Sequence, residues 1–144
     1  MLQLRKVTKI YGEGDTKVTA LKDVSLQVSP GDFIAIMGPS GSGKSTLLNI
    51  IGGLERLSSG EVILEGNRID NLDENALVNI RREKIAYVFQ QYHLIPSLTA
   101  LENVLLPLVF RRMDGEREKA RDILQKVGLA NRTEHKPNQL SGGE

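Results

Sequence analysis

Cysteine is absent from the sequence of 144 residues, and aromatic residues make up only 4% of it. Without cysteine, the chain can form neither disulfide bonds nor cysteine-ligated zinc sites. The sparse aromatic side chains give no platform on which the bases of a single-stranded nucleic acid would stack. These two shortages exclude a disulfide-stabilised scaffold and give no support to a nucleic-acid partner.

Long apolar runs and an excess of one charge are lacking as well. No apolar stretch approaches the roughly 18 residues that indicate a membrane-spanning helix, and residues 1–7 lack the apolar part of a signal peptide. The formal net charge is +1, which provides no bulk attraction to nucleic acid. We therefore expect a soluble, intracellular protein that forms one domain or part of a larger one.

The most informative stretch is rich in glycine. Residues 38–45 match the phosphate-binding pattern G-x-x-x-x-G-K-[ST]. The apolar run at 33–37 predicts a strand buried on both faces, and residues 46–51 predict a helix after the loop. Glycine lets the backbone curl around an anion, and the start of the helix adds amide groups and the positive end of its dipole. An ordinary flexible loop is the alternative, but the flanking strand and helix favour a phosphate site.

Two side chains of this loop have specific chemistry in the motif. Lys44 can reach the β- and γ-phosphates of a nucleotide, and the Ser45 hydroxyl can ligate Mg²⁺. The loop therefore predicts binding of a nucleotide together with Mg²⁺.

Shorter segments predict strands around the loop. Residues 2–7 and 24–28 alternate apolar and polar side chains, which predicts antiparallel strands with one exposed face. Residues 61–64 predict another short strand, and residues 85–89 predict a buried one. Gln90 follows that last strand at its carboxyl end, where open α/β sheets place their ligands.

Three further segments predict helices. Residues 73–83 begin with Asp73 as an N-cap. Residues 99–110 begin with a capping box, and Pro107 should end or kink this helix. Residues 114–127 predict the last helix. Its apolar face and terminating glycine consist of Ala120, Ile123, Leu124, Val127 and Gly128.

Two further motifs complete a recognisable set. Phe89-Gln90 stands at a predicted strand end, and residues 140–144 read Leu-Ser-Gly-Gly-Glu. With residues 38–45, and in the same order and spacing, they resemble the glutamine loop, the signature sequence and the phosphate loop of ATP-binding-cassette (ABC) ATPases. Residues 88–104 resemble one subgroup in particular, the lipoprotein-release and macrolide-export type of bacterial or archaeal transporter subunit.

This resemblance implies an α/β fold of the P-loop NTPase class with an ABC-type ATPase core. A mixed sheet would combine an antiparallel part with a parallel phosphate-loop part, and a helical subdomain would be inserted. Residues 1–91 would form the N-terminal part of the ATP-binding core, and residues 92–144 the helical subdomain up to the signature. The fold would be incomplete at its C-terminus, because the family continues past Glu144.

The resemblance also assigns roles to single residues. Tyr11 would stack on adenine, with a plain strand-end aromatic residue as the alternative. Gln90 would contact Mg²⁺ or the attacking water and report the nucleotide state, with a solvated glutamine as the alternative. Lys44 and Gln90 would act in catalysis, and Ser45 and Gln90 would lie at the metal. The other residues that would bind the phosphates of this subunit's or a second subunit's nucleotide are Gly38, Ser40, Gly41, Ser42, Gly43, Thr46, Ser141, Gly142 and Gly143.

The implied function is that of the ATP-binding subunit of an ABC transporter, which couples binding and hydrolysis of MgATP to transport by a membrane permease. Residues 92–110 would face the permease, and a second ATP-binding subunit would pair head-to-tail to sandwich two nucleotides. No nucleic-acid partner is expected. The protein would be peripheral at the cytoplasmic face of the membrane, with export or lipoprotein release favoured over import.

Parts that the family's chemistry needs are expected beyond residue 144: the Mg²⁺-coordinating Asp, the general-base Glu and the switch His. Hydrolysis by this chain alone is therefore expected to be absent or very weak. The phosphate-loop strand would lack a neighbour, so we expect aggregation or only partial order. One alternative is a non-catalytic nucleotide-binding fragment or decoy that pairs with complete subunits. Another is an ABC-type DNA-repair ATPase, which the compact motif spacing and the lack of cysteine disfavour.

Overall fold

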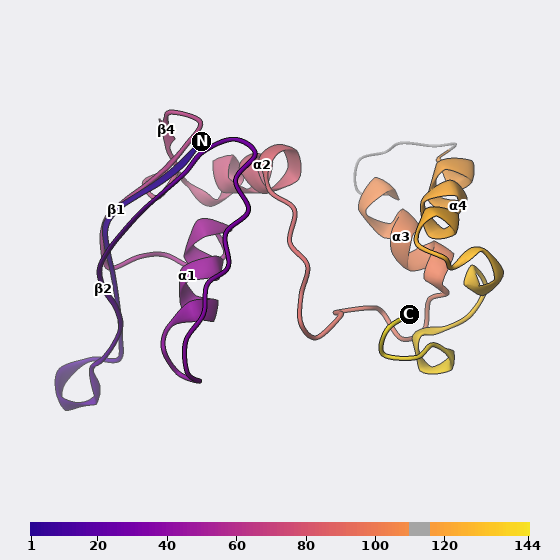
Figure 1. The fold of residues 1–144 in the computed structure, drawn as a ribbon, viewed down its shortest axis with the longest axis horizontal. Coiled ribbons are helices and arrows are strands. Elements are labelled where there is room, and N and C mark those ends of the chain that lie inside the picture. Colours follow the sequence, from indigo (N-terminus) through magenta and orange to yellow (C-terminus); the bar gives the residue numbers. More distant parts are fainter. Residues whose placement is uncertain (110–115) are drawn as a thin grey trace. The chain divides into compact units, whose positions relative to one another are not determined.

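The computed structural model describes residues 1–109 and 116–144 (Figure 1). It divides into two compact units, Met1–Tyr87 and Val88–Glu144. Phe110 and Asp114, where we expected one helix to end and the next to begin, lie outside the described residues. None of the helices in the described part of the chain has the length and apolar character needed to cross a membrane.

The first unit contains one antiparallel sheet with the strand order β2-β1-β3-β4. A 3₁₀ turn at Gly14–Thr16 joins the first two strands. Both strands that we predicted near the N-terminus are present, and both are longer than predicted. The strands are β1 (Leu2–Tyr11), β2 (Val18–Val28), β3 (Ser59–Leu64) and β4 (Asn67–Arg68).

A bulge interrupts the side-chain alternation of β1. The pairing register slips between Leu4 and Val7, where Lys6 has a φ of 47°. Leu4 and Val7 therefore both face the core, with exposed fractions of 2% and 0%, although they lie three positions apart. On β3, a Cβ at Gly60 would lie 2.5 Å from the Lys6 carbonyl oxygen, so only glycine permits this approach. The alternation predicted for residues 2–7 is therefore wrong beyond Leu4.

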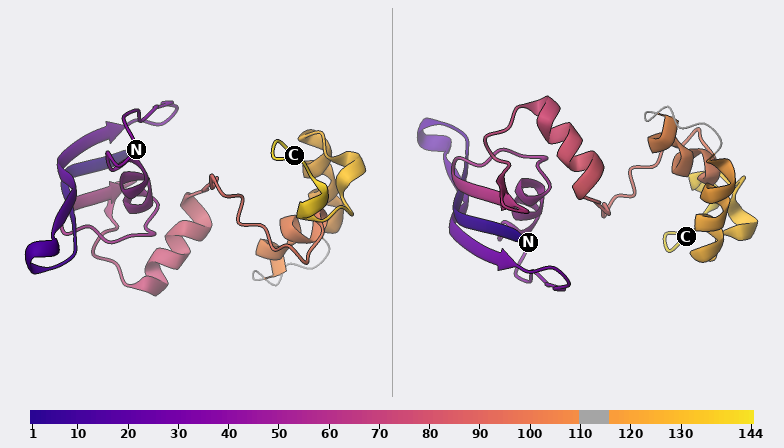
Figure 2. Two further views of the ribbon diagram at one scale, coloured as in Figure 1. Left: turned by 90° about the horizontal axis from the view of Figure 1, so that it is seen from below. Right: turned by 90° about the horizontal axis from the view of Figure 1, so that it is seen from above.

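Two helices complete the first unit, α1 (Lys44–Ile51) and α2 (Glu74–Lys84). The first of them lies beside one face of the sheet in all three views (Figures 1 and 2). The predicted N-cap is confirmed, because Asp73 Oδ1 accepts a hydrogen bond from the Ala76 amide at 2.8 Å. The core between sheet and helices consists of Leu4, Val7, Leu21, Leu47, Ile50, Val62, Ile69 and Leu77.

Two predicted strands are absent from the structure, at 33–37 and 85–89. Instead of being buried, Phe33 is 96% exposed and Met37 is 88% exposed. A strand forms only where a neighbouring strand completes its hydrogen bonds, and the described residues supply no neighbour for either segment. The antiparallel part of the predicted mixed sheet is thus present, whereas its parallel part is not formed.

The second unit is helical. It contains α3 (Ala100–Val109) and α4 (Arg117–Lys126), with 3₁₀ turns at Ala130–Arg132 and Pro137–Gln139. Its core consists of Ala100, Leu101, Ala120 and Leu124, against which the half-buried Leu140 packs.

The apolar face predicted for α4 is half correct. Ala120 and Leu124 are buried, but Ile123 is 52% exposed and Val127 is 65% exposed. Of this predicted face, Ala120 and Leu124 belong to the core of the second unit. Gly128, with a φ of 81°, follows the helix as predicted, and its amide donates to the Gln125 carbonyl at 3.0 Å.

The start of α3 is closed by the predicted capping box. The Thr99 amide donates to Glu102 Oε2 at 2.8 Å, and the Glu102 amide donates to Thr99 Oγ1 at 3.2 Å. Pro107 does not end the helix, which continues to Val109, and the alternative outcome that we expected, a kink at Pro107, stays a prediction. Proline removes one backbone hydrogen bond from the helix. The helix tolerates this loss because Pro107 lies near its end.

Candidate functional site

The phosphate loop leads directly into α1. Gly43 is the N-cap of this helix and has a φ of 87°, a left-handed conformation that favours glycine. A Cβ at this position would lie 2.5 Å from the Ala20 carbonyl oxygen and 2.9 Å from Leu21 Cδ2. The loop therefore rests on β2 at a point where no other residue fits, and this contact fixes the loop relative to the sheet.

The side chain of Lys44 folds back over the loop. Its ammonium group donates to the carbonyl oxygens of Gly38 at 2.9 Å and Pro39 at 2.7 Å. Ser42 Oγ lies 3.4 Å away. A positive charge thus lies within a curved backbone next to the amide groups of a helix start. This arrangement suits an anion such as phosphate.

Tyr11 lies next to the same helix. Its hydroxyl oxygen is 3.3 Å from Thr46 Oγ1, and the residue is 40% exposed. The structure therefore places the predicted stacking residue beside the first turn of α1. The Ser45 hydroxyl belongs to an exposed residue of that turn. Mg²⁺ keeps most of its ligands as water and phosphate and needs few from the protein, so an exposed hydroxyl at this position fits the predicted metal.

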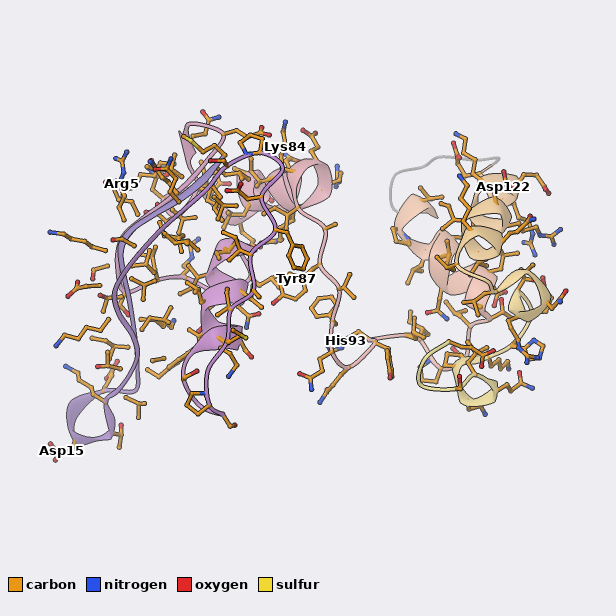
Figure 3. All side chains as sticks on the ribbon, viewed as in Figure 1. Arg5, Asp15, Lys84, Tyr87, His93 and Asp122 are labelled. Carbon is orange, nitrogen blue, oxygen red and sulfur yellow. The ribbon has the colours of Figure 1, made fainter. Side chains whose placement is uncertain are left out.

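The segment that follows α2 is attached to α1 by Tyr87, which Figure 3 labels. The Tyr87 hydroxyl donates to Asn49 Oδ1 at 2.9 Å. Its ring lies so close to Gly52 that a Cβ there would be 3.1 Å from Tyr87 Cε2. Although this segment is not a strand, its first half is held against the helix of the phosphate loop.

Within the second unit, Gln90 and the signature line one open hollow of about 600 Å³. Ser141, Gly142, Glu144 and Tyr92 are among the residues that line it. The Tyr92 hydroxyl would be 3.2 Å from a Cβ at Gly142, so this glycine leaves room for the tyrosine. Two motifs far apart in the sequence thus share one surface. Gln90 itself is exposed in an irregular segment rather than at a strand end.

The last residue of the signature, Glu144, forms contacts that hold the signature in its conformation. Glu144 Oε2 accepts a hydrogen bond from the Ser141 amide at 2.8 Å, and Glu144 Oε1 lies 3.1 Å from Arg132 Nε. The hydrogen bonds from the Ser141 amide and hydroxyl, together with Arg132, lower the pKa of Glu144 to about 2. The carboxylate therefore stays charged and holds Ser141 in place.

Lys9, Glu55 and Arg132 also make contacts at or near these groups, and the sequence assigned no role to any of the three. Lys9 lies two positions before Tyr11 on the same strand, which was a usable signal, and its ammonium group lies 4.8 Å from the centre of the Tyr11 ring. Glu55 and Arg132 carried no comparable pattern. In the described part of the chain, no group of three or more acidic or histidine side chains gathers into a metal-binding cluster.

A glycine-rich loop that runs into a helix and encloses a lysine defines a P-loop protein. Residues 21–144 match the model of the family described as ABC transporter, and the chain belongs to this family.

Similar proteins from bacteria and archaea agree with that assignment. An ABC transporter ATP-binding protein of Methanocaldococcus jannaschii, MJ0796, is 51% identical over all of this chain and 64% of its own length. The lipoprotein-releasing system ATP-binding protein LolD of Francisella tularensis subsp. holarctica is 45% identical, again over all of this chain and 64% of its length. The macrolide export ATP-binding/permease protein MacB of Bdellovibrio bacteriovorus is 48% identical over all of this chain and 22% of its length. The predicted resemblance to this subgroup is confirmed.

A solved structure shows the same fold. The dimeric post-hydrolysis state of MJ0796 bound to ADP and Pi superposes with a TM-score of 0.90 at 51% identity, covering 99% of this chain and 64% of that one. The predicted fold class, an ABC-type ATPase core, is confirmed. The chain spans about 64% of the length of MJ0796 and LolD.

Proposed function

We propose that this chain is the nucleotide-binding part of an ABC transporter ATPase, which binds MgATP and acts on a membrane permease. The phosphate loop is the observation that carries the proposal. Its left-handed Gly43, its central Lys44 and the start of α1 together form a cradle for phosphate. Membership of the family and the relatives' names as ATP-binding proteins support ATP as the nucleotide.

In the proposed complex, Lys44 exchanges carbonyl partners for phosphate oxygens. Its present acceptors on Gly38 and Pro39 are neutral, whereas a phosphate oxygen carries negative charge and attracts the ammonium group more strongly. The exchange therefore favours the nucleotide. Ser45 would hold the Mg²⁺, which would neutralise part of the phosphate charge when bound. The other phosphate-binding residues in this proposal are Gly38, Ser40, Gly41, Ser42, Gly43 and Thr46.

Tyr11 stacks on the adenine base in the same proposal. Its ring is partly exposed and its hydroxyl contacts the first turn of α1. The base would therefore stack on a residue that contacts α1, and the phosphates would lie in the loop that leads into the same helix. Base stacking on an aromatic ring contributes about 1–3 kcal/mol.

The second unit would serve a partner's nucleotide. We assign Ser141, Gly142 and Gly143 to the γ-phosphate held by a second subunit in a head-to-tail dimer, and Gln90 to sensing the nucleotide. The hollow shared by Gln90 and the signature supports this pairing of roles. The MJ0796 structure is described as dimeric and bound to ADP and Pi, which supports the dimer. Residues 92–144 would form the helical subdomain, and a permease would lie against residues 92–110.

We also propose that the chain alone binds MgATP with little or no hydrolysis. The proposal rests on the resemblance to the family, which implies that its second metal anchor and general base have no counterpart among the Asp and Glu residues of this sequence. Phosphoryl transfer depends on positioned charges around the phosphates, so binding without them would not suffice for turnover.

The test is calorimetric titration of MgATP into the chain and into Lys44→Ala, with phosphate release measured alongside. We expect Lys44→Ala to weaken binding by at least roughly tenfold, because it removes a charged hydrogen bond to phosphate. Lys22→Ala is the control, because Lys22 is exposed on β2. Equal binding by the wild type and Lys44→Ala would refute the phosphate site. Rapid Lys44-dependent phosphate release would refute the proposed lack of turnover.

A further inference from the structure

The Tyr11 side chain is held at two points. Lys9 and Tyr11 lie two positions apart on β1. The Lys9 ammonium lies over the Tyr11 ring, 4.8 Å from its centre. At the tip of the ring, the hydroxyl oxygen lies 3.3 Å from Thr46 Oγ1 on α1. One face and the tip of the ring are therefore fixed by protein groups.

Lys9 is fixed in turn by the segment that follows α1. Its ammonium donates to the Arg56 carbonyl oxygen at 2.8 Å and pairs with Glu55 Oε1 at 3.1 Å. The Lys9 and Glu55 side chains are only 15% and 21% exposed. Because water screens such a pair only in part, it holds more firmly than a pair on the open surface.

Glu55 remains charged in this position. Partial burial acts to raise the pKa of Glu55, but interactions with Tyr11 and Lys9 outweigh this effect and lower the pKa below its usual value. The carboxylate therefore keeps the ammonium group of Lys9 in one place over the ring.

A cation over one face of an aromatic ring also changes the other face. The ammonium group attracts the π electrons of Tyr11, so the opposite face becomes less negative and better suited to an electron-rich ring such as a purine. Tyr11 is 40% exposed, which leaves surface for such a contact.

We infer that Lys9 and Glu55 are positioning residues for nucleotide binding, which hold the Tyr11 ring beside α1 so that a purine nucleotide meets its stacking surface and phosphate loop already arranged. The inference rests on the proposed function. In the proposed complex, neither Lys9 nor Glu55 touches phosphate, and both act through Tyr11. A site arranged in advance loses less conformational entropy when the ligand binds, and its affinity is higher for that reason.

The experiment compares two ligands, MgATP and inorganic triphosphate, on the full chain and on Lys9→Met. Methionine keeps an apolar stem of similar length and removes the charge. We expect the affinity for MgATP to fall roughly 5- to 10-fold, the cost of ordering one loosened side chain when the ligand binds, while the affinity for inorganic triphosphate changes by less than about twofold. Lys22→Met, at an exposed position on β2, should change neither affinity.

A second variant protects the test against misfolding. Lys9→Met leaves the Glu55 carboxylate without its partner, so Lys9→Met/Glu55→Gln removes both charges together, and thermal unfolding of each variant checks the fold. The same selective loss in the double variant supports the inference. Unchanged MgATP affinity in the folded double variant, or an equal loss for both ligands, would overturn it.

Failure of the proposed function has a different result. If the wild-type chain binds neither ligand, or if Lys44→Ala binds both as well as the wild type, the proposed function fails and the inference falls with it. If binding depends on Lys44 but not on Lys9, only the inference fails. NMR gives a ligand-free readout: the Lys9 Hε resonances should be shifted upfield by the Tyr11 ring, and Tyr11→Leu should remove the shift.

Discussion

At the scale of single residues, the phosphate loop contains two kinds of glycine. Gly41 and Gly43 have φ values of 78° and 87°, so both are in a left-handed conformation. A Cβ at Gly41 would meet nothing within 4 Å, whereas a Cβ at Gly43 would lie 2.5 Å from the Ala20 carbonyl oxygen. The sequence motif includes Gly43 but does not reveal this contact, because it depends on β2.

This difference gives a matched pair of variants. Gly41→Ala should cost about 1 kcal/mol of unfolding free energy, because alanine is strained at positive φ. Gly43→Ala should cost about 3 kcal/mol, because the loop must also move away from β2. Urea denaturation of the ligand-free chain measures both values. Equal losses would show that the contact with Ala20 does not restrain the loop.

Glu144 supplies a pH-dependent prediction. Its folded-state pKa is lowered to about 2 from an ordinary value of 4.5, chiefly by the hydrogen bonds from Ser141 and then by Arg132. A lowered pKa means that these contacts stabilise the signature above pH 4.5 and are lost as the pH falls from 4.5 towards 2.

An NMR titration of the Ser141 amide tests this prediction. The midpoint should lie near 2 in the wild type, and Arg132→Gln should raise it, because the carboxylate then loses its cation. Lys126→Gln on α4 is the control and should leave the midpoint unchanged. A wild-type midpoint at the ordinary value of 4.5 would mean that Glu144 does not cap the signature.

At the scale of elements, local signals predicted local structure well. Asp73 and the Thr99–Glu102 box lie at helix starts because capping needs only residues within one turn. The strands at 33–37 and 85–89 were predicted wrongly. Hydrophobicity marks a segment that suits a strand, but the strand itself depends on a neighbour elsewhere in the chain.

The candidate site divides in the same way. The phosphate loop was predictable because its residues are contiguous and their spacing follows from the shape of a phosphate group. The contact of Lys9 with Glu55 was not, because the two residues are far apart in the sequence and a single charge on a strand has many possible partners. The bulge at Lys6 was missed for a similar reason, since it depends on the pairing of three strands.

The capping box of α3 allows a prediction at this scale. Thr99→Val keeps the shape of the side chain but removes the Oγ1 acceptor of the Glu102 amide. We expect the free energy of unfolding to fall by about 1 kcal/mol and the amides in the first turn of α3 to exchange their hydrogens faster. Thr99→Ser retains the acceptor and should behave nearly as the wild type. Equal exchange rates in the two variants would argue against a role for the hydroxyl.

At the scale of the whole molecule, large apolar side chains stand in solvent. Phe33, Met37 and Val88 are 96%, 88% and 96% exposed, and none of them lies in a regular element. Extended apolar segments with unpaired backbone groups favour association between chains. Our sequence-based expectation that the isolated chain aggregates or orders only in part stays a prediction, and these exposures support it.

The corresponding test replaces the apolar surface. Phe33→Ser/Met37→Ser should raise the concentration at which the chain stays monomeric, as measured by size-exclusion chromatography with light scattering. Val18→Ser is the control, because Val18 is 62% exposed but belongs to β2, where its backbone is paired. A control that helps as much as the double variant would mean that unpaired backbone at 33–37 is not the cause.

The close approach of Gly43 to Ala20 has a consequence for how the molecule responds to a ligand. An anion that reduces the motion of the phosphate loop should also restrain β2, although no residue of β2 belongs to the phosphate loop. Amide hydrogens around Ala20 should then exchange more slowly once the loop is filled. Coupling free energies are reciprocal, so the ligand should bind more weakly to chains in which β2 is open, by the same factor as the bound ligand shifts β2 towards its closed state. The order of the antiparallel sheet and the binding of a ligand at the loop are thus coupled.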